Sequence, residues 1–149
     1  MAITWRTDYA IRLLYELARI EPARRSTVRE LSEAAGVPYD YARGIAADLV
    51  SAGLLASRRG VHGGVEMART ASDVTLLDIF RALDEPASIA LCTGEVAVCD
   101  RSGTCPLHNV IWSELDCLIE GYLASVSLES AVEAGAALGD LRRIAGRSA

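Results

Sequence analysis

The chain has 149 residues, a formal net charge of −5 and 51% hydrophobic residues. This length suits one domain, or a small domain with an appended element, and can bury a hydrophobic core. No run approaches the roughly 18–20 apolar residues that a membrane-spanning helix needs, so we expect no membrane partner. The first residues also lack the basic and apolar segments of a secretory signal, so we expect a cytoplasmic protein.

The charged residues are unevenly distributed. Residues 1–81 contain eleven Arg and ten acidic residues, a net charge of +1, whereas residues 82–149 contain four Arg and ten acidic residues, a net charge of −6. All basic residues are Arg, so any contact with phosphates or bases would be made by a forked guanidinium group. The first half is therefore the better candidate for a DNA-binding side.

The first half of the sequence predicts three helices. Apolar residues recur at helical spacing over residues 7–20. A short second helix, residues 28–35, opens on the capping-box pair Thr27 and Glu30 and closes at a glycine. A third helix is expected over residues 38–52. Two short helices that are joined by a tight turn and follow a first helix form the helix-turn-helix pattern, although a plain helical hairpin is the alternative.

In a helix-turn-helix, the second helix of the pair enters the major groove of DNA and presents its first side chains to base edges. The candidate DNA-binding residues on this helix are Tyr39, Asp40, Tyr41 and Arg43. Residues 54–58 and 65–68 then form two short extended candidates around a glycine-rich turn, which predicts a small two-stranded wing. Its tip carries Arg58, Arg59 and His62, which could reach phosphates or a minor groove. A solvated hairpin tip is the alternative.

The second half of the sequence predicts a helix whose first turn is capped by the pair Thr75 and Asp78 and which stops at Pro86. A long helix is expected over residues 106–125, with only a short helix and a tail after Ser127. Apolar residues cover more of the long helix than a lone surface helix would bury, so we expect two partners. One would be the rest of the chain, and the other the same helix of a second subunit in an isologous homodimer.

Three cysteines and a histidine stand close together between the last two predicted helices. They are Cys92, Cys99, Cys105 and His108, in the stretch CTGEVAVCDRSGTCPLH. Thiolate sulfur is a soft ligand for zinc, copper(I) or iron-sulfur clusters, and imidazole can complete such a site. Disulfides are disfavoured in a reducing cytosol, and the surrounding glycine and polar residues favour a loop over buried core cysteines. The stretch therefore predicts a metal or cluster loop.

The order of these segments resembles the Rrf-type bacterial regulators, the family of IscR, NsrR and RirA. The resemblance extends from RTDYAIRLLYELA through GVPYDYARGIAADLVSAGLLASRRGVHGG to the cysteine loop and CPLHNVIW. It implies a homodimeric transcription factor that binds a double-stranded DNA operator. It also implies an iron-sulfur cluster whose loss, oxidation or nitrosylation changes DNA affinity, and we expect a repressor.

The resemblance implies that Cys92, Cys99 and Cys105 are cluster ligands, and it leaves two candidates for the fourth. His108 is similar to the IscR arrangement, in which a histidine completes a two-iron cluster within one subunit. Asp8 is similar to the NsrR arrangement, in which an aspartate from the partner subunit completes a four-iron cluster. We favour His108 and a two-iron cluster, because imidazole is the more usual ligand and lies nearer in sequence.

We therefore predict a mainly α fold, with a winged helix-turn-helix domain at residues 1–86 that includes a two-stranded β wing. A cysteine-rich cluster loop at residues 87–105 and a dimerisation helix with a C-terminal segment at residues 106–149 would follow. One alternative keeps DNA binding but makes the loop a structural Cys3His zinc site without sensing. A thiol enzyme built on Cys105 and His108 is a remote alternative, because no third orienting residue can be identified. We expect no enzymatic activity.

Overall fold

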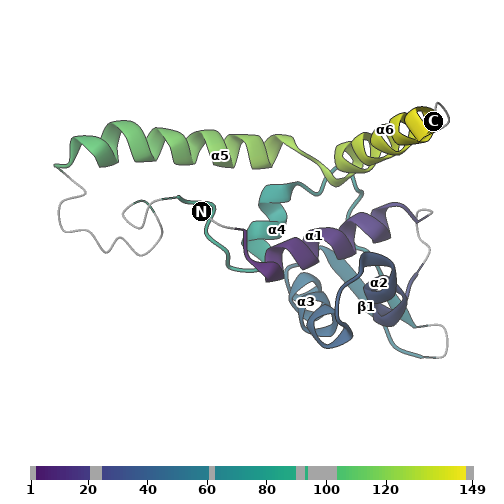
Figure 1. Cartoon of the computed structure of the whole chain (residues 1–149). Helices are drawn as coiled ribbons and strands as arrows, with labels where there is room; N and C mark the ends of the chain where they lie inside the picture. Colours follow the sequence, from purple (N-terminus) through teal and green to yellow (C-terminus); the bar gives the residue numbers. More distant parts are fainter. Residues whose placement is uncertain (1–2, 21–24, 61–62, 90–92, 94–103, 147–149) are drawn as a thin grey trace.

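The computed structural model describes residues 3–20, 25–60, 63–89, 93 and 104–146 (Figure 1). Its elements in chain order are α1 (Trp5–Ala18), α2 (Val28–Ala35), α3 (Tyr39–Ser51), β1 (Leu55–Arg58), β2 (Gly64–Met67), α4 (Leu76–Ala82), the π-helix η1 (Leu107–Trp112), α5 (Ser113–Ser125) and α6 (Leu128–Gly146). The predicted mainly α fold with a small two-stranded wing is confirmed. In the described part of the chain, no helix has the length and apolar character needed to cross a membrane.

Helix α1 lies at the centre of the core. Its residues Ala10, Leu13, Leu14 and Leu17 recur at spacings of three and four and are buried at 4% exposure or less, as expected for one face of a helix. The helices α2, α3, α4 and α6 all pack against it. The helix begins at Trp5 rather than at Thr7, because the side chain of Thr4 caps it by accepting a hydrogen bond from the Thr7 backbone N–H at 3.2 Å.

The predicted helix-turn-helix is present. Thr27 and Glu30 form the expected capping box at the start of α2. Gly36 ends this helix with a φ of +64°, a left-handed conformation that glycine adopts without a Cβ penalty. Helix α3 begins directly after Pro38 and packs on both α1 and α2. The turn therefore fixes α3 across the two preceding helices.

The wing is an antiparallel pair in which Leu55 lies opposite Met67 and Arg58 lies opposite Gly64. Strand β1 begins one residue later than predicted, because Leu54 is buried in the core ahead of it, and β2 lies one residue earlier than predicted. Ser26, just before α2, exchanges two backbone hydrogen bonds with Val65, at 3.1 and 2.9 Å. The root of the wing is thus attached directly to the start of the helix-turn-helix.

Helix α4 opens on a second capping box, formed by Thr75 and Asp78. Burial alone would raise the pKa of Asp78, but hydrogen bonds from Thr75 and the nearby Arg69 and Arg81 guanidinium groups lower it overall. The prediction that this helix continues to Pro86 was wrong. It ends at Ala82, and the chain then turns away through residue 84, which has a φ of +53°.

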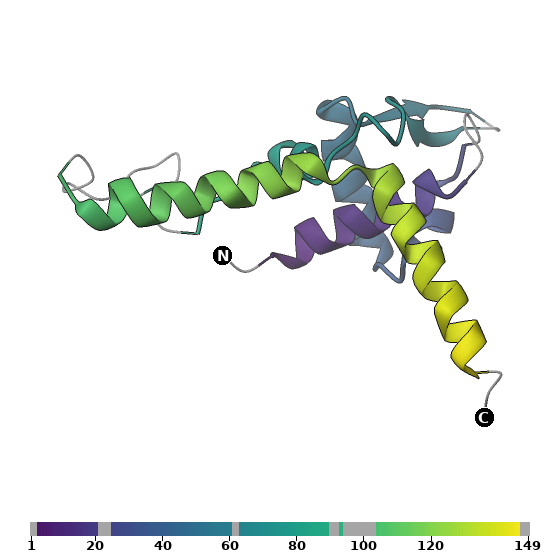
Figure 2. The ribbon, with the colours of Figure 1, turned by 90° about the horizontal axis from the view of Figure 1, so that it is seen from above.

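The last helices leave the winged domain in two directions (Figures 1 and 2). Helix α5 extends away from the body, with η1 at its far end, and α6 packs against α1. The expectation of only a short helix after Ser127 was wrong, since α6 spans 19 residues. Leu128 at its start is completely buried in the core of the winged domain, and its backbone N–H donates to the Val74 carbonyl at 2.9 Å.

We predict that Gly64→Ala lowers the free energy of unfolding by about 1–3 kcal/mol, the usual cost of overpacking. A Cβ at this position would lie 2.7 Å from the Ser26 carbonyl oxygen. Urea unfolding monitored by circular dichroism measures the change. Gly44→Ala on α3 is the matched control, because its Cβ would meet nothing within 4 Å and alanine is favoured in helices by about 0.5–1 kcal/mol. Equal effects of the two substitutions would contradict the prediction.

Candidate functional site

Helix α3 separates its side chains into a buried face and an exposed face. Its buried residues are Ala42, Ile45, Ala46 and Leu49. The four predicted DNA-binding residues, Tyr39, Asp40, Tyr41 and Arg43, are all exposed near the start of the helix. The core therefore holds α3 by one side and leaves free the side chains that a recognition helix presents to base edges.

Aromatic side chains connect this exposed surface to the neighbouring helices. Tyr41 meets Tyr9 of α1 edge-on, with ring centroids 6.0 Å apart, and Tyr9 lies 5.9 Å from Trp5. The guanidinium carbon of Arg29, on α2, lies 4.4 Å from the centroid of the Tyr39 ring. Sequence reasoning missed Arg29, although its position in the first turn of the first helix of the motif was a usable indication.

The predicted wing residues Arg58 and Arg59 are exposed, whereas His62 lies outside the described residues. The turn between the strands depends on Gly63, whose N–H donates to the Gly60 carbonyl at 2.9 Å. A Cβ at Gly63 would lie 2.5 Å from the Arg58 carbonyl oxygen and therefore could not be accommodated. Glycine at this position lets the chain reverse tightly enough to bring both arginines to the end of the hairpin.

The pairing of arginines distinguishes this surface from the rest of the domain. Ion pairs within the described part of the chain involve Arg6, Arg12, Arg19, Arg25 and Arg69. Arg43, Arg58 and Arg59 have no carboxylate within 4 Å in that part. Their charge is therefore available to a polyanion, because an arginine held by a protein carboxylate would have to exchange that partner for phosphate.

The cysteine loop is described only at its ends. Cys92 and Cys99 lie outside the described residues, while Cys105 is half-buried just before η1. His108 is the second residue of η1, and its Nδ1 atom is buried without a hydrogen-bond partner. A buried, unpartnered ring nitrogen is costly in an ordinary core but suits a metal ligand. No group of three potential metal ligands gathers among the described residues.

The π-helical turn at His108 has an identifiable cause. The backbone N–H of Ser113 donates to the His108 carbonyl five residues earlier, and the Ser113 hydroxyl donates to the same carbonyl at 2.7 Å. Two donors on one carbonyl favour the wider turn over the usual i to i−4 bond. Isolated π-helical turns are frequent at functional sites. Here the turn fixes the orientation of the imidazole relative to α5.

The other candidate fourth ligand, Asp8, lies in the first turn of α1 as predicted. Its Oδ2 atom is 2.8 Å from Nη2 of Arg12, an ion pair that lacks the alignment of a hydrogen bond. The half-buried carboxylate, whose Oδ2 atom is covered from solvent and has no hydrogen-bond partner, is therefore held by charge attraction. The structure does not bring it together with Cys105 and His108 among the described residues.

The segment that enters the cysteine loop is attached to α5. The Ile89 backbone N–H donates to Oδ1 of Asp116 at 2.9 Å. Ala87, Phe80 and Leu123 belong to one small buried cluster beside this contact. The segment before the loop is therefore bonded to α5, and the segment after the loop, at Cys105, leads directly into η1 and α5. Both ends of the loop are thus connected to the same pair of consecutive helices.

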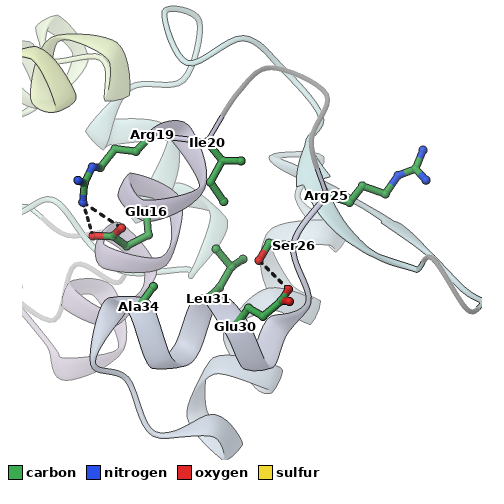
Figure 3. A pocket seen from close by; sticks show the side chains of 8 residues that line it. All are labelled: Glu16, Arg19, Ile20, Arg25, Ser26, Glu30, Leu31 and Ala34. Carbon is green, nitrogen blue, oxygen red and sulfur yellow. Dashed lines mark hydrogen bonds and ion pairs between the residues drawn. The ribbon is translucent and has the colours of Figure 1, made fainter.

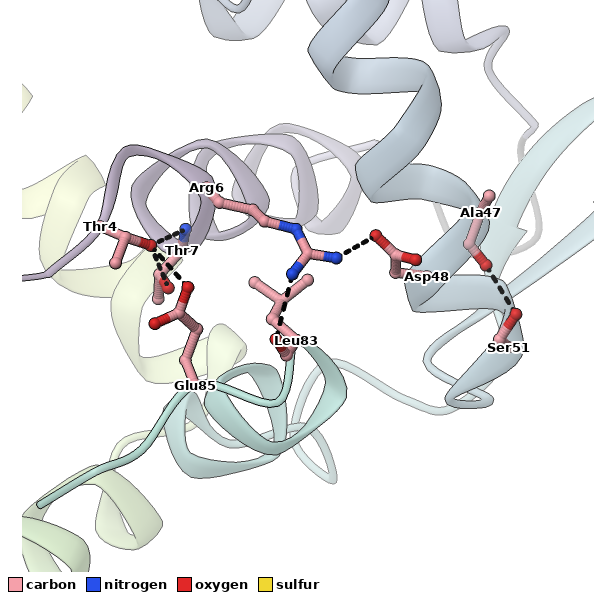
Figure 4. A network of polar contacts seen from close by, with 8 residues as sticks. All are labelled: Thr4, Arg6, Thr7, Ala47, Asp48, Ser51, Leu83 and Glu85. Atoms are coloured by element: carbon pink, nitrogen blue, oxygen red, sulfur yellow. Dashed lines mark hydrogen bonds and ion pairs between the residues drawn. The ribbon is translucent and has the colours of Figure 1, made fainter. Parts of the chain in front are cut away.

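Arg6 connects this segment to the recognition helix (Figure 4). Its Nη1 donates to the Leu83 carbonyl at 3.1 Å, and its Nη2 donates to Asp48 on α3 at 2.6 Å. Next to it, the Thr4 hydroxyl donates to Glu85 at 2.9 Å. The start of α1 is thereby bound both to α3 and to the chain that leads into the cysteine loop.

A separate cleft lies between the end of α1 and α2 (Figure 3) and measures about 520 Å³. Its charged side chains have protein partners: Arg19 pairs with Glu16, and Arg25 pairs with Glu66 of the wing, both at 3.1 Å. None of the predicted site residues lines this cleft. It lies apart from the exposed face of α3 and from η1.

The model of the Rrf2 family, described as iron-dependent transcriptional regulator, matches residues 3–134. The chain belongs to the Rrf2 family. The protein Rrf2 of Nitratidesulfovibrio vulgaris is 29% identical over 114 residues, which cover 76% of this chain and 75% of that protein. The HTH-type transcriptional regulator IscR of Photorhabdus laumondii is 28% identical over 132 residues, which cover 89% of this chain and 79% of that protein.

Solved structures agree on the Rrf2 fold. CymR, the global cysteine regulator of B. subtilis, matches with a TM-score of 0.75 at 22% identity over 89% of this chain and 97% of that one. IscR of T. potens matches with a TM-score of 0.72 at 22% identity over 91% of this chain and 88% of that one. The chain is therefore a winged-helix, DNA-binding transcription regulator rather than an enzyme.

We predict that the two contacts of Arg6 differ in their contribution to stability. Arg6→Met should cost about 1–3 kcal/mol, because it leaves the partly buried Leu83 carbonyl without a donor. Asp48→Asn should cost less than about 1 kcal/mol, because the Arg6–Asp48 pair is exposed at 45% and 40%. Urea titrations of the two variants compare these costs, and a larger loss in Asp48→Asn would show that the ion pair dominates.

Proposed function

We propose that this Rrf2-family regulator is a homodimeric repressor that senses redox state, nitric oxide or iron-sulfur status through a cluster held by its cysteine loop. Cys92, Cys99 and Cys105 would be the thiolate ligands. His108 is the favoured fourth ligand, for a two-iron cluster, and Asp8 of the partner subunit is the alternative, for a four-iron cluster. Because its partner is an operator in genomic DNA, we place this activity in the cytoplasm.

The observation that carries the proposal is the state of His108. Its Nδ1 is buried and has no hydrogen-bond partner, and it lies three residues beyond Cys105 in a π-helical turn. Leaving a polar atom in this state costs free energy that metal coordination would recover. Thiolate and imidazole donors fit iron-sulfur clusters, and also zinc. The family description, iron-dependent transcriptional regulator, favours iron over zinc.

When bound, a cluster would supply a centre that reacts with oxidants or nitric oxide and whose ligands depend on its state. The protein residues around the loop would convert a change in cluster state into a change in the position of α3. Asp116 holds the entry of the loop on α5 through Ile89, and Arg6 holds the preceding segment at Leu83 against α3 through Asp48. A change in the loop would therefore act through the backbone of residues 83–89, which joins these two sets of hydrogen bonds, on the recognition helix.

The homodimer is proposed from the apolar surface of η1 and α5. Large side chains on this surface are exposed in the single chain: Leu107, Val110, Ile111, Leu115, Leu118 and Tyr122. Contiguous apolar surface on a projecting helix is typical of an interface. A symmetric pair of such helices would bury it and would present two copies of α3 to two half-sites of an operator, roughly 34 Å apart.

We predict that protein purified without oxygen absorbs broadly above about 400 nm and contains matching iron and acid-labile sulfide. Cys105→Ser should lose the absorbance, whereas Cys117→Ser should keep it, because this exposed thiol lies on α5 away from the proposed ligands. Removal of the cluster should weaken binding to an operator, selected from random-sequence duplexes, by about tenfold or more, which is within the usual range of allosteric coupling.

The same experiment separates the ligands and tests the sensing mechanism. Loss of iron in His108→Ala but not in Asp8→Ala assigns the fourth ligand to His108, and the reverse result assigns it to Asp8. A colourless protein with about one zinc per chain would replace the cluster with a structural Cys3His site. Equal operator affinity with and without the cluster would refute sensing while leaving DNA binding intact.

We predict that Leu118→Glu converts the protein to a monomer in sedimentation equilibrium. Leu118 is 64% exposed on α5, and a charge there would be buried without a partner in the proposed interface. Glu120→Gln is the control, because two positions along a helix point to nearly opposite sides. The interface lies elsewhere if Leu118→Glu remains dimeric, and wild-type monomers would refute the homodimer itself.

A further inference from the structure

We propose that Arg29 is a phosphate-binding residue of the DNA interface and that Tyr39 is its positioning residue. The inference rests on the DNA-binding activity of the family and adds Arg29, which is not among the predicted DNA-binding residues, and a positioning role for Tyr39, which is. Arg29 lies in the first turn of α2, and Tyr39 is the first residue of α3. Both side chains are exposed, and the guanidinium lies 4.4 Å from the centroid of the tyrosine ring.

The pairing of charges favours a ligand for Arg29 outside the protein. In the described part of the chain, Arg29 has no carboxylate within 4 Å, whereas five other arginines are ion-paired. It shares this condition with Arg43 of the recognition helix and with Arg58 and Arg59 of the wing. Arg81, on α4, also has no carboxylate within 4 Å in that part, although its charge helps to lower the pKa of Asp78. Four of the five arginines without an ion pair among the side chains that the structure describes, all except Arg81, thus belong to the three elements of a winged helix that approach DNA.

The position of Arg29 is unfavourable for helix stability alone. The first turn of a helix carries the positive end of the macrodipole and disfavours a cation. The same end, with its free backbone N–H groups, attracts phosphate. In a helix-turn-helix the first helix of the pair crosses the DNA backbone while the second enters the groove. The Glu30 carboxylate of the capping box already lies at this helix end and offsets part of the repulsion, and a phosphate bound by Arg29 would offset it further.

Tyr39 restricts the orientation of the Arg29 guanidinium, which would otherwise rotate freely on an exposed side chain. A guanidinium is planar, and stacking on an aromatic ring restricts its orientation while its N–H edges remain available for bidentate hydrogen bonds. The ring belongs to α3, so Arg29 keeps a fixed position relative to the side chains that follow Tyr39 on the recognition helix. The contact would thus set the register of α3 in the groove without reading bases itself.

The test is the salt dependence of binding to a mixed-sequence DNA duplex, measured by fluorescence anisotropy on the full chain. Arg29→Gln should reduce the slope of log affinity against log salt by about 0.9 per bound subunit, as expected for one lost phosphate contact. Its affinity should fall several-fold to a similar extent on different sequences. Arg19→Gln is the matched control, since this exposed arginine is already paired with Glu16, and its slope should equal that of the wild type.

The role of Tyr39 is tested by a double-mutant cycle. Tyr39→Leu removes the aromatic ring and should lower affinity several-fold with a nearly unchanged salt slope, since the charge of Arg29 remains. If Tyr39 acts through Arg29, adding Tyr39→Leu to Arg29→Gln should change the affinity little further. Unfolding midpoints of all variants identify any that fail to fold.

The possible outcomes distinguish failure of the proposed Arg29–phosphate contact from failure of DNA binding itself. A wild-type slope in Arg29→Gln overturns the phosphate contact, and additive effects of the two substitutions overturn the positioning role of Tyr39. If the wild-type protein itself binds no duplex, the DNA-binding function fails first. Retained affinity and slope in Arg29→Lys would show that charge alone suffices and that the stacked fork adds nothing.

Discussion

The buried face of α1 holds the two halves of the chain together. Ala10 and Leu14 are completely buried, and helices from the helix-turn-helix, α4 and α6 pack around them. Since the winged domain is small, this face supplies a large share of the apolar area that can be buried. Leu128, far along the sequence, completes the same cluster. The winged domain is therefore not finished until the chain has passed through the cysteine loop and α5.

This shared core gives a physical basis for the proposed communication between the loop and DNA. Helix α1 carries Asp8, a candidate ligand, and Tyr9, which contacts Tyr41 on the recognition helix. Arg6 at the start of α1 bonds to both α3 and the segment before the loop. Packed helices shift as units rather than deform continuously. A displacement of α1 or of the loop segment would therefore move α3 relative to the wing.

Electrostatics then distinguish the surface that meets DNA from the surface that stabilises the fold. The paired arginines hold helices and the wing root in place, and Arg25 joins the segment before α2 to Glu66 on β2. Apart from Arg81 on α4, the arginines without such partners among the side chains that the structure describes occur on α2, α3 and the wing. Although the whole chain is acidic, with a net charge of −5, this local arrangement suits a polyanionic ligand, because the distribution of charge decides steering more than its total.

The sequence alone determined the local elements, because capping boxes, the Gly36 turn and the glycine-rich hairpin act within a few residues of each other. It also predicted the exposed residues of α3 from their place at the start of the second helix of the helix-turn-helix pattern. Only the tertiary structure decided the return of α6 to the core, the π-helical turn at His108 and the stacking of Arg29 on Tyr39. The first and third depend on contacts between residues distant in sequence, and the π-helical turn depends on which donors bond to the His108 carbonyl. A pattern along the chain does not reveal which of several possible contacts forms.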